Sequence, residues 1–103
     1  MWAQLIKTRI KDGEEAGLAQ LTAQLRAAEQ AGSGMVRTTV MRDQADPTSI
    51  SILVVFESEE AARAREGDPR RGEAMAEVQA TMQQILAEPP SFNDLEVLEE
   101  YTP

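Results

Sequence analysis

The side chains best suited to hold an aromatic small molecule are Trp2, Phe56 and Tyr101. Trp2 is the only tryptophan of the chain, and its indole could line a pocket and stack on an aromatic ligand. The Tyr101 hydroxyl could contact a substrate oxygen, whereas Phe56 has no polar group and could form only a pocket wall. Each residue also has an ordinary structural role. Trp2 and Phe56 could pack in the core, Trp2 could anchor a dimer interface, and Tyr101 could cap the edge of a sheet.

A second candidate group is the pair Arg70 and Arg71, which follows an Asp-Pro dipeptide at the start of a predicted helix. The N-terminus of a helix carries partial positive charge, so two cations there need compensation. Nearby carboxylates could supply it as surface ion pairs, namely Asp68, Glu66 and Glu73. Alternatively, the two guanidinium groups could form a mouth that attracts a carboxylate or phenolate substrate.

Composition excludes most other kinds of site. The chain contains neither cysteine nor histidine, which excludes disulfides, thiolate metal sites, cysteine nucleophiles and the usual proximal heme ligand. No metal site is therefore expected. Glutamates occur in adjacent pairs, but such neighbours point apart on a strand or helix and do not share one proton. Thr38 and Thr39 have no adjacent base to activate them.

The charge balance limits the partners. Eighteen acidic and ten basic residues give a formal net charge of −8, which opposes binding to nucleic acid and to anionic membranes. No segment approaches the roughly 20 apolar residues that cross a bilayer. The first residues lack the basic-then-apolar order of a signal peptide. We therefore expect a cytoplasmic protein that binds neither nucleic acid nor membrane.

The elements that must position these side chains follow from the spacing of apolar residues. Four strands are predicted, over residues 2–10, 35–42, 48–56 and 92–101. Leucines at helical spacing predict a first helix that begins near Glu14 and stops before Gly32. Capping residues predict a short helix after Ser58 and a longer one that begins at Pro69 and ends before two prolines. With 103 residues there is room for one core, hence a single domain.

Two amphipathic helices and four strands in the order β-α-β-β-α-β predict an α+β, ferredoxin-like sandwich with an antiparallel sheet and both helices on one face. The third strand is apolar on both faces, because Leu53 and Val55 alternate with its main apolar row. The first strand likewise carries Leu5 and Ile6 on opposite faces. An apolar outer face of this kind indicates an interface, and we expect a homodimer, although single exposed apolar residues also occur on monomers.

A set of short motifs is spread over the whole chain. It comprises Lys11-Asp12-Gly13-Glu14-Glu15, then Glu57-Ser58-Glu59-Glu60-Ala61-Ala62, Gly67-Asp68-Pro69-Arg70-Arg71 before a long amphipathic helix, and Pro89-Pro90 before an acidic strand that ends at Tyr101. Together these motifs resemble the antibiotic biosynthesis monooxygenase family. The resemblance implies that residues 1–103 form one domain of this family and that two copies make a dimeric α+β barrel, in which two sheets pack face to face.

The family includes cofactor-independent oxygenases of polycyclic aromatic substrates, heme-degrading enzymes and proteins without an assigned activity. In the heme-degrading branch an asparagine, a tryptophan and a histidine carry the chemistry. The matching positions of this sequence are Ile6, Phe56 and the neighbourhood of Arg70 and Arg71. All three depart from the pattern, and the chain has no histidine elsewhere, so heme degradation of that type is not expected.

Two functional hypotheses follow from the resemblance. The first is a cofactor-independent monooxygenase that orients an electron-rich aromatic or polyketide-like molecule which itself reacts with oxygen. Its candidate pocket comprises Trp2, Gln4, Ile6, Thr8, Phe56, Arg70, Arg71 and Tyr101. The second is a non-catalytic small-molecule-binding or structural dimer of the same fold. A cavity of roughly 300 Å³ or more with convergent polar groups would favour the first, and a closed apolar cleft the second.

Overall fold

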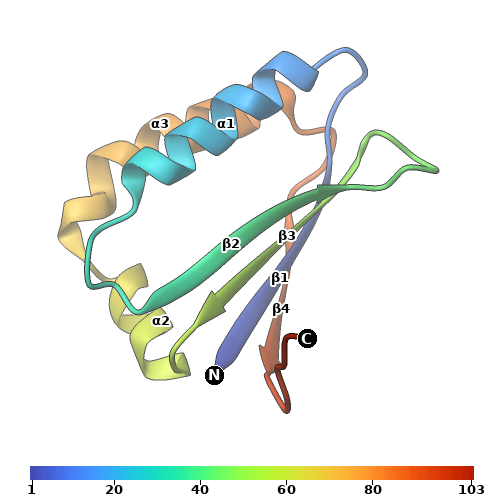
Figure 1. Ribbon diagram of the computed structural model, residues 1–103. Coiled ribbons are helices and arrows are strands. Elements are labelled where there is room, and N and C mark those ends of the chain that lie inside the picture. Colours follow the sequence, from blue (N-terminus) through green and yellow to red (C-terminus); the bar gives the residue numbers. More distant parts are fainter.

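A computed structural model describes the protein over residues 1–103 (Figure 1). The strands are β1 (Trp2–Arg9), β2 (Met35–Arg42), β3 (Ser49–Phe56) and β4 (Ser91–Glu96). The helices are α1 (Glu15–Ala28), α2 (Glu59–Glu66) and α3 (Gly72–Ile85). A 3-10 turn at Pro69–Arg71 joins α2 to α3. The order of elements is the predicted one, with the second helical region divided at Gly67.

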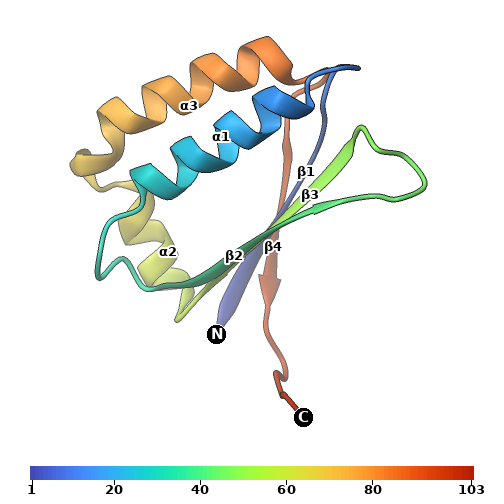
Figure 2. The ribbon, with the colours of Figure 1, turned by 45° about the horizontal axis from the view of Figure 1, so that its top comes forward.

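The four strands form one antiparallel sheet in the order β2-β3-β1-β4. Helices α1 and α3 lie side by side on one side of this sheet, and α2 lies near the end of β3 (Figure 1 and Figure 2). The architecture is therefore the predicted α+β, ferredoxin-like sandwich. None of its helices is long and apolar enough to pass through a membrane.

The core lies between the helices and the inner face of the sheet. Every second residue of β3 points into it because strand side chains alternate between faces. These residues are Ile50, Ile52, Val54 and Phe56, none of which is more than 7% exposed. The helices contribute the buried residues Leu21, Ala28, Ala62, Val78 and Ile85. The apolar row of β3 is thus the surface on which the helices pack.

The outer face of the sheet is the side turned away from α1 and α3. Register places Ala3 and Leu5 of β1 there, opposite Val55 and Leu53 of β3. Ala3 and Val55 are buried, and Leu5 and Leu53 are half-buried. Met41 also lies on this face and is 42% exposed, because odd-numbered residues of β2 between 37 and 41 face outward.

The last strand ends earlier than predicted. β4 stops at Glu96 instead of continuing to Tyr101. The carboxylate of Glu100 accepts two hydrogen bonds from the guanidinium of Arg37, at 3.0 and 3.1 Å. Arg37 belongs to β2, at the opposite edge of the sheet from β4. The C-terminal segment therefore leaves the strand direction and crosses the outer face, so an apolar-polar alternation there did not produce a longer strand.

Helices α1 and α3 approach closely at Gly17. A Cβ added at Gly17 would lie 2.5 Å from Cγ2 of Ile85, which is 2% exposed. A distance this short cannot be accommodated without displacement of a buried side chain. Gly72, at the start of α3, has no neighbour within 4 Å of the corresponding position, so the two helical glycines form a matched pair.

We predict that Gly17→Ala lowers the free energy of unfolding by about 1–2 kcal/mol, because the overpacking cost exceeds the gain in helix propensity. Gly72→Ala should raise it by about 0.5–1 kcal/mol, since it gains the propensity without a clash. Urea unfolding followed by circular dichroism measures both changes. Equal stabilisation by the two substitutions would show that the close approach of α1 and α3 does not limit their packing.

Candidate functional site

Trp2 and Phe56 face each other across β1 and β3 and belong to the core. Their ring centroids are 5.9 Å apart with an interplanar angle of 50°. The guanidinium carbon of Arg63 lies 5.1 Å from the centroid of the Trp2 ring, and that of Arg65 lies 5.3 Å from the Phe56 ring. Both rings are thus covered by side chains of α2 and gain cation–π contacts from them.

Gln4, Ile6 and Thr8 share the inner face of β1, as their alternation predicts. The side-chain amide of Gln4 donates to Asp94 at 3.2 Å, and the hydroxyl of Thr8 donates to the backbone carbonyl of Glu88 at 3.1 Å. Ile6 packs against the core. The three residues therefore lie in one row, and the polar groups of two of them are occupied by β4 and by the segment after α3.

Tyr101 lies away from this row, in the C-terminal segment. Its side chain is 83% exposed, and the preceding Glu100 is bound to Arg37 on the outer face. The structure therefore does not bring Tyr101 together with the inner-face residues within one chain. Its part in a substrate pocket stays a prediction.

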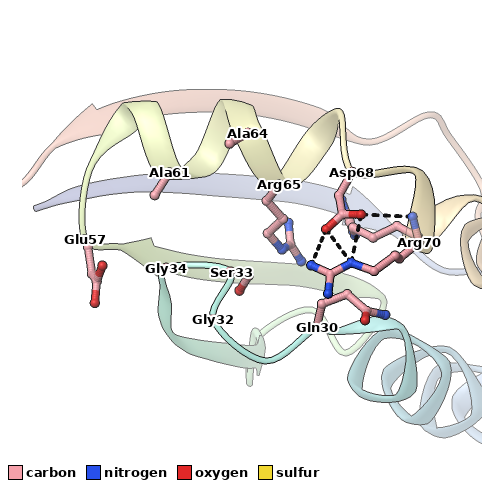
Figure 3. Close-up of a pocket in the computed structure, with 11 residues that line it drawn as sticks. Gln30, Gly32, Ser33, Gly34, Glu57, Ala61, Ala64, Arg65, Asp68 and Arg70 are labelled. Carbon is pink, nitrogen blue, oxygen red and sulfur yellow. Dashed lines mark hydrogen bonds and ion pairs between the residues drawn. The ribbon is translucent and has the colours of Figure 1, made fainter.

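Arg70 and Arg71 line a cavity of about 320 Å³ between α2, the turn after it and the loop that follows α1 (Figure 3). We call it the arginine cavity. Its wall is formed by Gln30, Gly32, Ser33, Gly34, Glu57, Ala61, Ala64, Arg65, Asp68, Arg70 and Arg71. Apart from two alanines on α2, the side chains of this wall are polar or charged, and none of the other predicted pocket residues belongs to it.

A loop with two glycines brings the walls of the arginine cavity together. Gly32 and Gly34 have φ angles of +77° and +83°, a region that glycine adopts without strain. A Cβ at Gly34 would lie 2.6 Å from Cβ of Ala61 on α2. The small residues at both positions thus allow the loop and α2 to approach closely.

Arg65 and Glu29 form the inner ion pair of this region. The Arg65 guanidinium donates three hydrogen bonds to the Glu29 carboxylate, at 2.7–3.1 Å. Both side chains are less than one-fifth exposed, at 16% and 17%. Burial raises the pKa of Glu29, but hydrogen bonds from Arg65 and Ser33 outweigh it, so the pKa lies below its usual value. The pair ties the end of α1 to α2.

Arg70 and Asp68 form the outer ion pair. The Asp68 carboxylate accepts from the Arg70 side chain at 2.5–3.0 Å and from its backbone N–H at 2.9 Å. These hydrogen bonds, the side-chain ones first, lower the pKa of Asp68 to about 2. Asp68 also caps the 3-10 turn, so the compensation expected from the sequence is present for Arg70.

Arg71 has no such partner. It forms no salt bridge, and its Nε is buried without a hydrogen bond. Its Nη2 donates only to the sulfur of Met75, at 3.3 Å. Burial, and then repulsion from Arg65, lower the pKa of Arg71, although a guanidinium remains protonated near neutral pH. The arginine cavity therefore contains one positive charge that no carboxylate of the chain contacts.

The sequence did not reveal Arg65, Glu29, Ser33 or Glu57 as site residues. Arg65 and Glu29 are 36 positions apart, and ion pairs between distant positions leave no periodic pattern. The sequence did contain one signal of a close approach between the loop and the short helix, namely their small residues. These are Gly32 and Gly34 in the loop and Ala61 and Ala64 on the helix. No group of three acidic side chains gathers in the structure to hold a metal ion.

A second, shallower hollow of about 460 Å³ lies along the C-terminal part of α3. Its lining residues are Gln79, Met82, Gln83, Leu86, Ala87, Glu88, Pro89 and Pro90. Thr8 reaches this region through its hydrogen bond to Glu88. The only ionisable side chain that lines this hollow is Glu88, and it pairs with Arg9 at 3.5 Å. The arginine cavity is therefore the stronger candidate for a site that recognises charge.

Comparison with known proteins agrees with this fold. The sequence pattern of the antibiotic biosynthesis monooxygenase family matches residues 1–87. The chain therefore belongs to the antibiotic biosynthesis monooxygenase family. No curated protein matches the sequence significantly.

Several solved structures share the fold. The NE2512 protein of unknown function from Nitrosomonas europaea has 22% identity and a TM-score of 0.74, with 99% of this chain and 93% of that chain covered. Rv0793 from Mycobacterium tuberculosis has 18% identity and a TM-score of 0.71, with 98% of each chain covered. A candidate antibiotic biosynthesis monooxygenase from Nitrosomonas europaea has 15% identity and a TM-score of 0.76, with 96% and 100% covered. At these identities the likeness shows the fold alone.

We predict that the carboxyl group of Asp68 titrates at about 2 instead of 3.8. Since the folded-state pKa lies below the ordinary value, the pair stabilises the protein fully above the ordinary pKa, and this contribution is lost as pH falls through the folded-state pKa. Carbon-detected NMR of the side-chain carboxyl measures the midpoint. Arg70→Gln should return it toward the ordinary value, and an unchanged midpoint in that variant would contradict the assigned cause.

Proposed function

We propose that this chain is a cofactor-independent monooxygenase that acts on an electron-rich aromatic small molecule and works as a homodimer. The observation that carries this proposal is the arginine cavity. Its volume of about 320 Å³ falls in the usual range of small-molecule sites, roughly 300–1,000 Å³. Charged and polar groups from three segments of the chain converge on it, which is typical of sites that bind or convert small molecules.

The reaction asks little of the side chains. A methylene group of the substrate supplies its own electrons and reacts with one molecule of dioxygen to give a ketone and one molecule of water. One oxygen atom thus enters the product, and the other leaves in water together with both methylene hydrogens. The protein must orient the substrate, keep bulk water away and stabilise the anion that forms when the carbon loses a proton. No redox cofactor is needed for this balance.

Two residues of the arginine cavity suit these tasks. Arg71 can stabilise an enolate or phenolate, because its guanidinium has no carboxylate partner within the chain. Glu57 lines the cavity at the end away from Arg70 (Figure 3) and forms no salt bridge, so its carboxylate is free to accept the proton. Arg65 and Asp68 are held in ion pairs and would position the walls.

The homodimer in this proposal is supported by the outer face. Leu5 and Leu53 are half-buried at its centre, and Leu95 and Met41 beside them are 40% and 42% exposed. The C-terminal segment covers only part of this face, around its link to Arg37. A second copy that packs its sheet against this one would remove the remaining apolar surface from water.

One observation favours a second candidate function, a non-catalytic dimer that binds a small molecule. Trp2 and Phe56 are covered by each other and by Arg63 and Arg65. An aromatic substrate would therefore lack the indole platform that the sequence suggested. Only alanine supplies apolar wall in the arginine cavity, which suits recognition of a polar group better than burial of several fused rings.

Oxygen uptake with anthrone, a tricyclic aromatic with a reactive methylene group, tests the proposed reaction. We predict consumption of one dioxygen per anthrone at a rate about tenfold or more above the uncatalysed rate. Glu57→Gln and Arg71→Gln should each remove most of this enhancement and bring the rate close to the uncatalysed one. Arg42→Gln, on β2 away from the cavity, should retain the wild-type rate. A folded protein that shows only the uncatalysed rate would favour the non-catalytic candidate.

Light scattering coupled to size-exclusion chromatography tests the dimer. We predict that the wild type elutes as a dimer and that Leu53→Glu, which places a charge at the centre of the outer face, elutes as a monomer. Val40→Glu is the matched control, because Val40 lies on the inner side of the edge strand β2 and is 37% exposed. A wild-type monomer at micromolar concentration would refute the dimer, and circular dichroism shows whether each variant folds.

A further inference from the structure

The guanidinium of Arg71 is the group of the arginine cavity whose hydrogen-bonding capacity the chain leaves most unused. A guanidinium has five N–H donors in a planar fork. In Arg71 the Nε is buried and unpartnered, and Nη2 donates only to the sulfur of Met75, which is a weak acceptor. A buried charged donor without an acceptor costs free energy. Since Arg71 lines the cavity, an acceptor that binds there would supply a partner to the donors of this guanidinium that the chain leaves free.

The carboxylates nearest to this group are engaged elsewhere. Glu29 receives three hydrogen bonds from Arg65, and Asp68 receives its hydrogen bonds from Arg70. Glu29, Glu66 and Asp68 attract Arg71 only at longer range. A rearrangement that gave Arg71 one of the two paired carboxylates would leave another guanidinium unpaired, so no exchange of these partners satisfies all three arginines of the wall.

We propose that Arg71 binds the carboxylate of a small organic acid seated in the arginine cavity. The planar fork of a guanidinium matches the two oxygens of a carboxylate. The inference rests on the proposed small-molecule function of this cavity and goes beyond it by naming the chemical class of the ligand. Binding of an acid can be measured without turnover, so it is separable from the oxygenase reaction.

The charges around Arg71 favour an anion with a single charge over a dianion. Three guanidinium groups line the cavity, and two of them are paired with Glu29 and Asp68. Arg71 alone has no contacting carboxylate, while Glu57 elsewhere on the wall adds a further negative charge, so these groups together carry no net positive charge. A phosphate dianion would place two negative charges beside these carboxylates, in a chain with a net charge of −8. A monocarboxylate is therefore the better match.

Substitutions of the different arginines of the cavity should weaken ligand binding to different extents, which makes the inference testable. Benzoate is a suitable probe, and benzamide is its uncharged isostere. We expect saturable changes in the NMR amide resonances of Gly32, Ser33 and Gly34 with sodium benzoate, and none with benzamide at equal concentration. Arg71→Gln should weaken benzoate binding about tenfold or more, as loss of a charge-assisted hydrogen bond predicts. Arg42→Gln, with the same change in charge outside the cavity, should weaken it less than twofold.

Two further variants separate recognition from folding. Arg71→Lys keeps the charge but loses the planar fork, so its affinity should lie between those of the wild type and Arg71→Gln. Arg70→Gln changes the charge within the same cavity at a residue already paired with Asp68, and should weaken binding less than Arg71→Gln does. The melting temperature of Arg71→Gln should equal or exceed that of the wild type, because the substitution removes an unpaired, half-buried charge.

Several outcomes would overturn the inference. These are equal binding of benzamide and benzoate, benzoate affinity that Arg71→Gln leaves unchanged, and inorganic phosphate that binds more tightly than benzoate at equal ionic strength. Arg71-dependent binding of benzoate without any oxygen uptake would refute the oxygenase and leave the carboxylate site standing. Oxygen uptake by a protein that does not bind benzoate would refute the carboxylate site and leave the oxygenase standing.

Discussion

The apolar row of β3 is the contact surface on which the rest of the structure depends. Ile50, Ile52, Val54 and Phe56 form this row, and α1, α2 and α3 all bury side chains on it. Leu53 and Val55 make the opposite face of β3 apolar as well, so that face also gains from being covered. The C-terminal segment covers part of that face, and the remainder is the apolar surface from which we infer a second copy.

The arginine cavity results from how α2 is attached to this frame. Ser58 caps α2 by accepting from the backbone N–H of Ala61 at 3.1 Å, and Arg65 fastens the helix to Glu29 at the end of α1. A partly buried ion pair contributes stability only when its geometry and hydrogen bonds offset desolvation, and this pair has three hydrogen bonds. The cavity wall is therefore held by hydrogen bonds at Arg65, whereas at Arg71 it carries a positive charge that no carboxylate contacts.

Fold and function are supported here by different observations. Relatives with 15–22% identity share the whole architecture, which shows how many sequences satisfy the same packing requirement. Chemistry depends on a few side chains, and a likeness at these identities does not show which residues carry it in this chain. The functional proposals therefore rest on the arginine cavity and on Arg71, and family membership supplies the reaction class to be tested.

The sequence by itself determined the order of elements and the fold class. Alternating apolar residues predicted β3 and its two apolar faces, and the Asp68-Pro69 signal predicted the break before α3, because strand alternation and helix capping are local properties. The sequence did not predict where β4 ends, since the course of the chain after Glu96 depends on Arg37 at the other edge of the sheet. Only the tertiary structure decided that Arg70 is matched by Asp68 while Arg71 is not. The spacing of two adjacent arginines is the same in either case, and partners as distant as Glu29 and Arg65 meet only once the helices have packed.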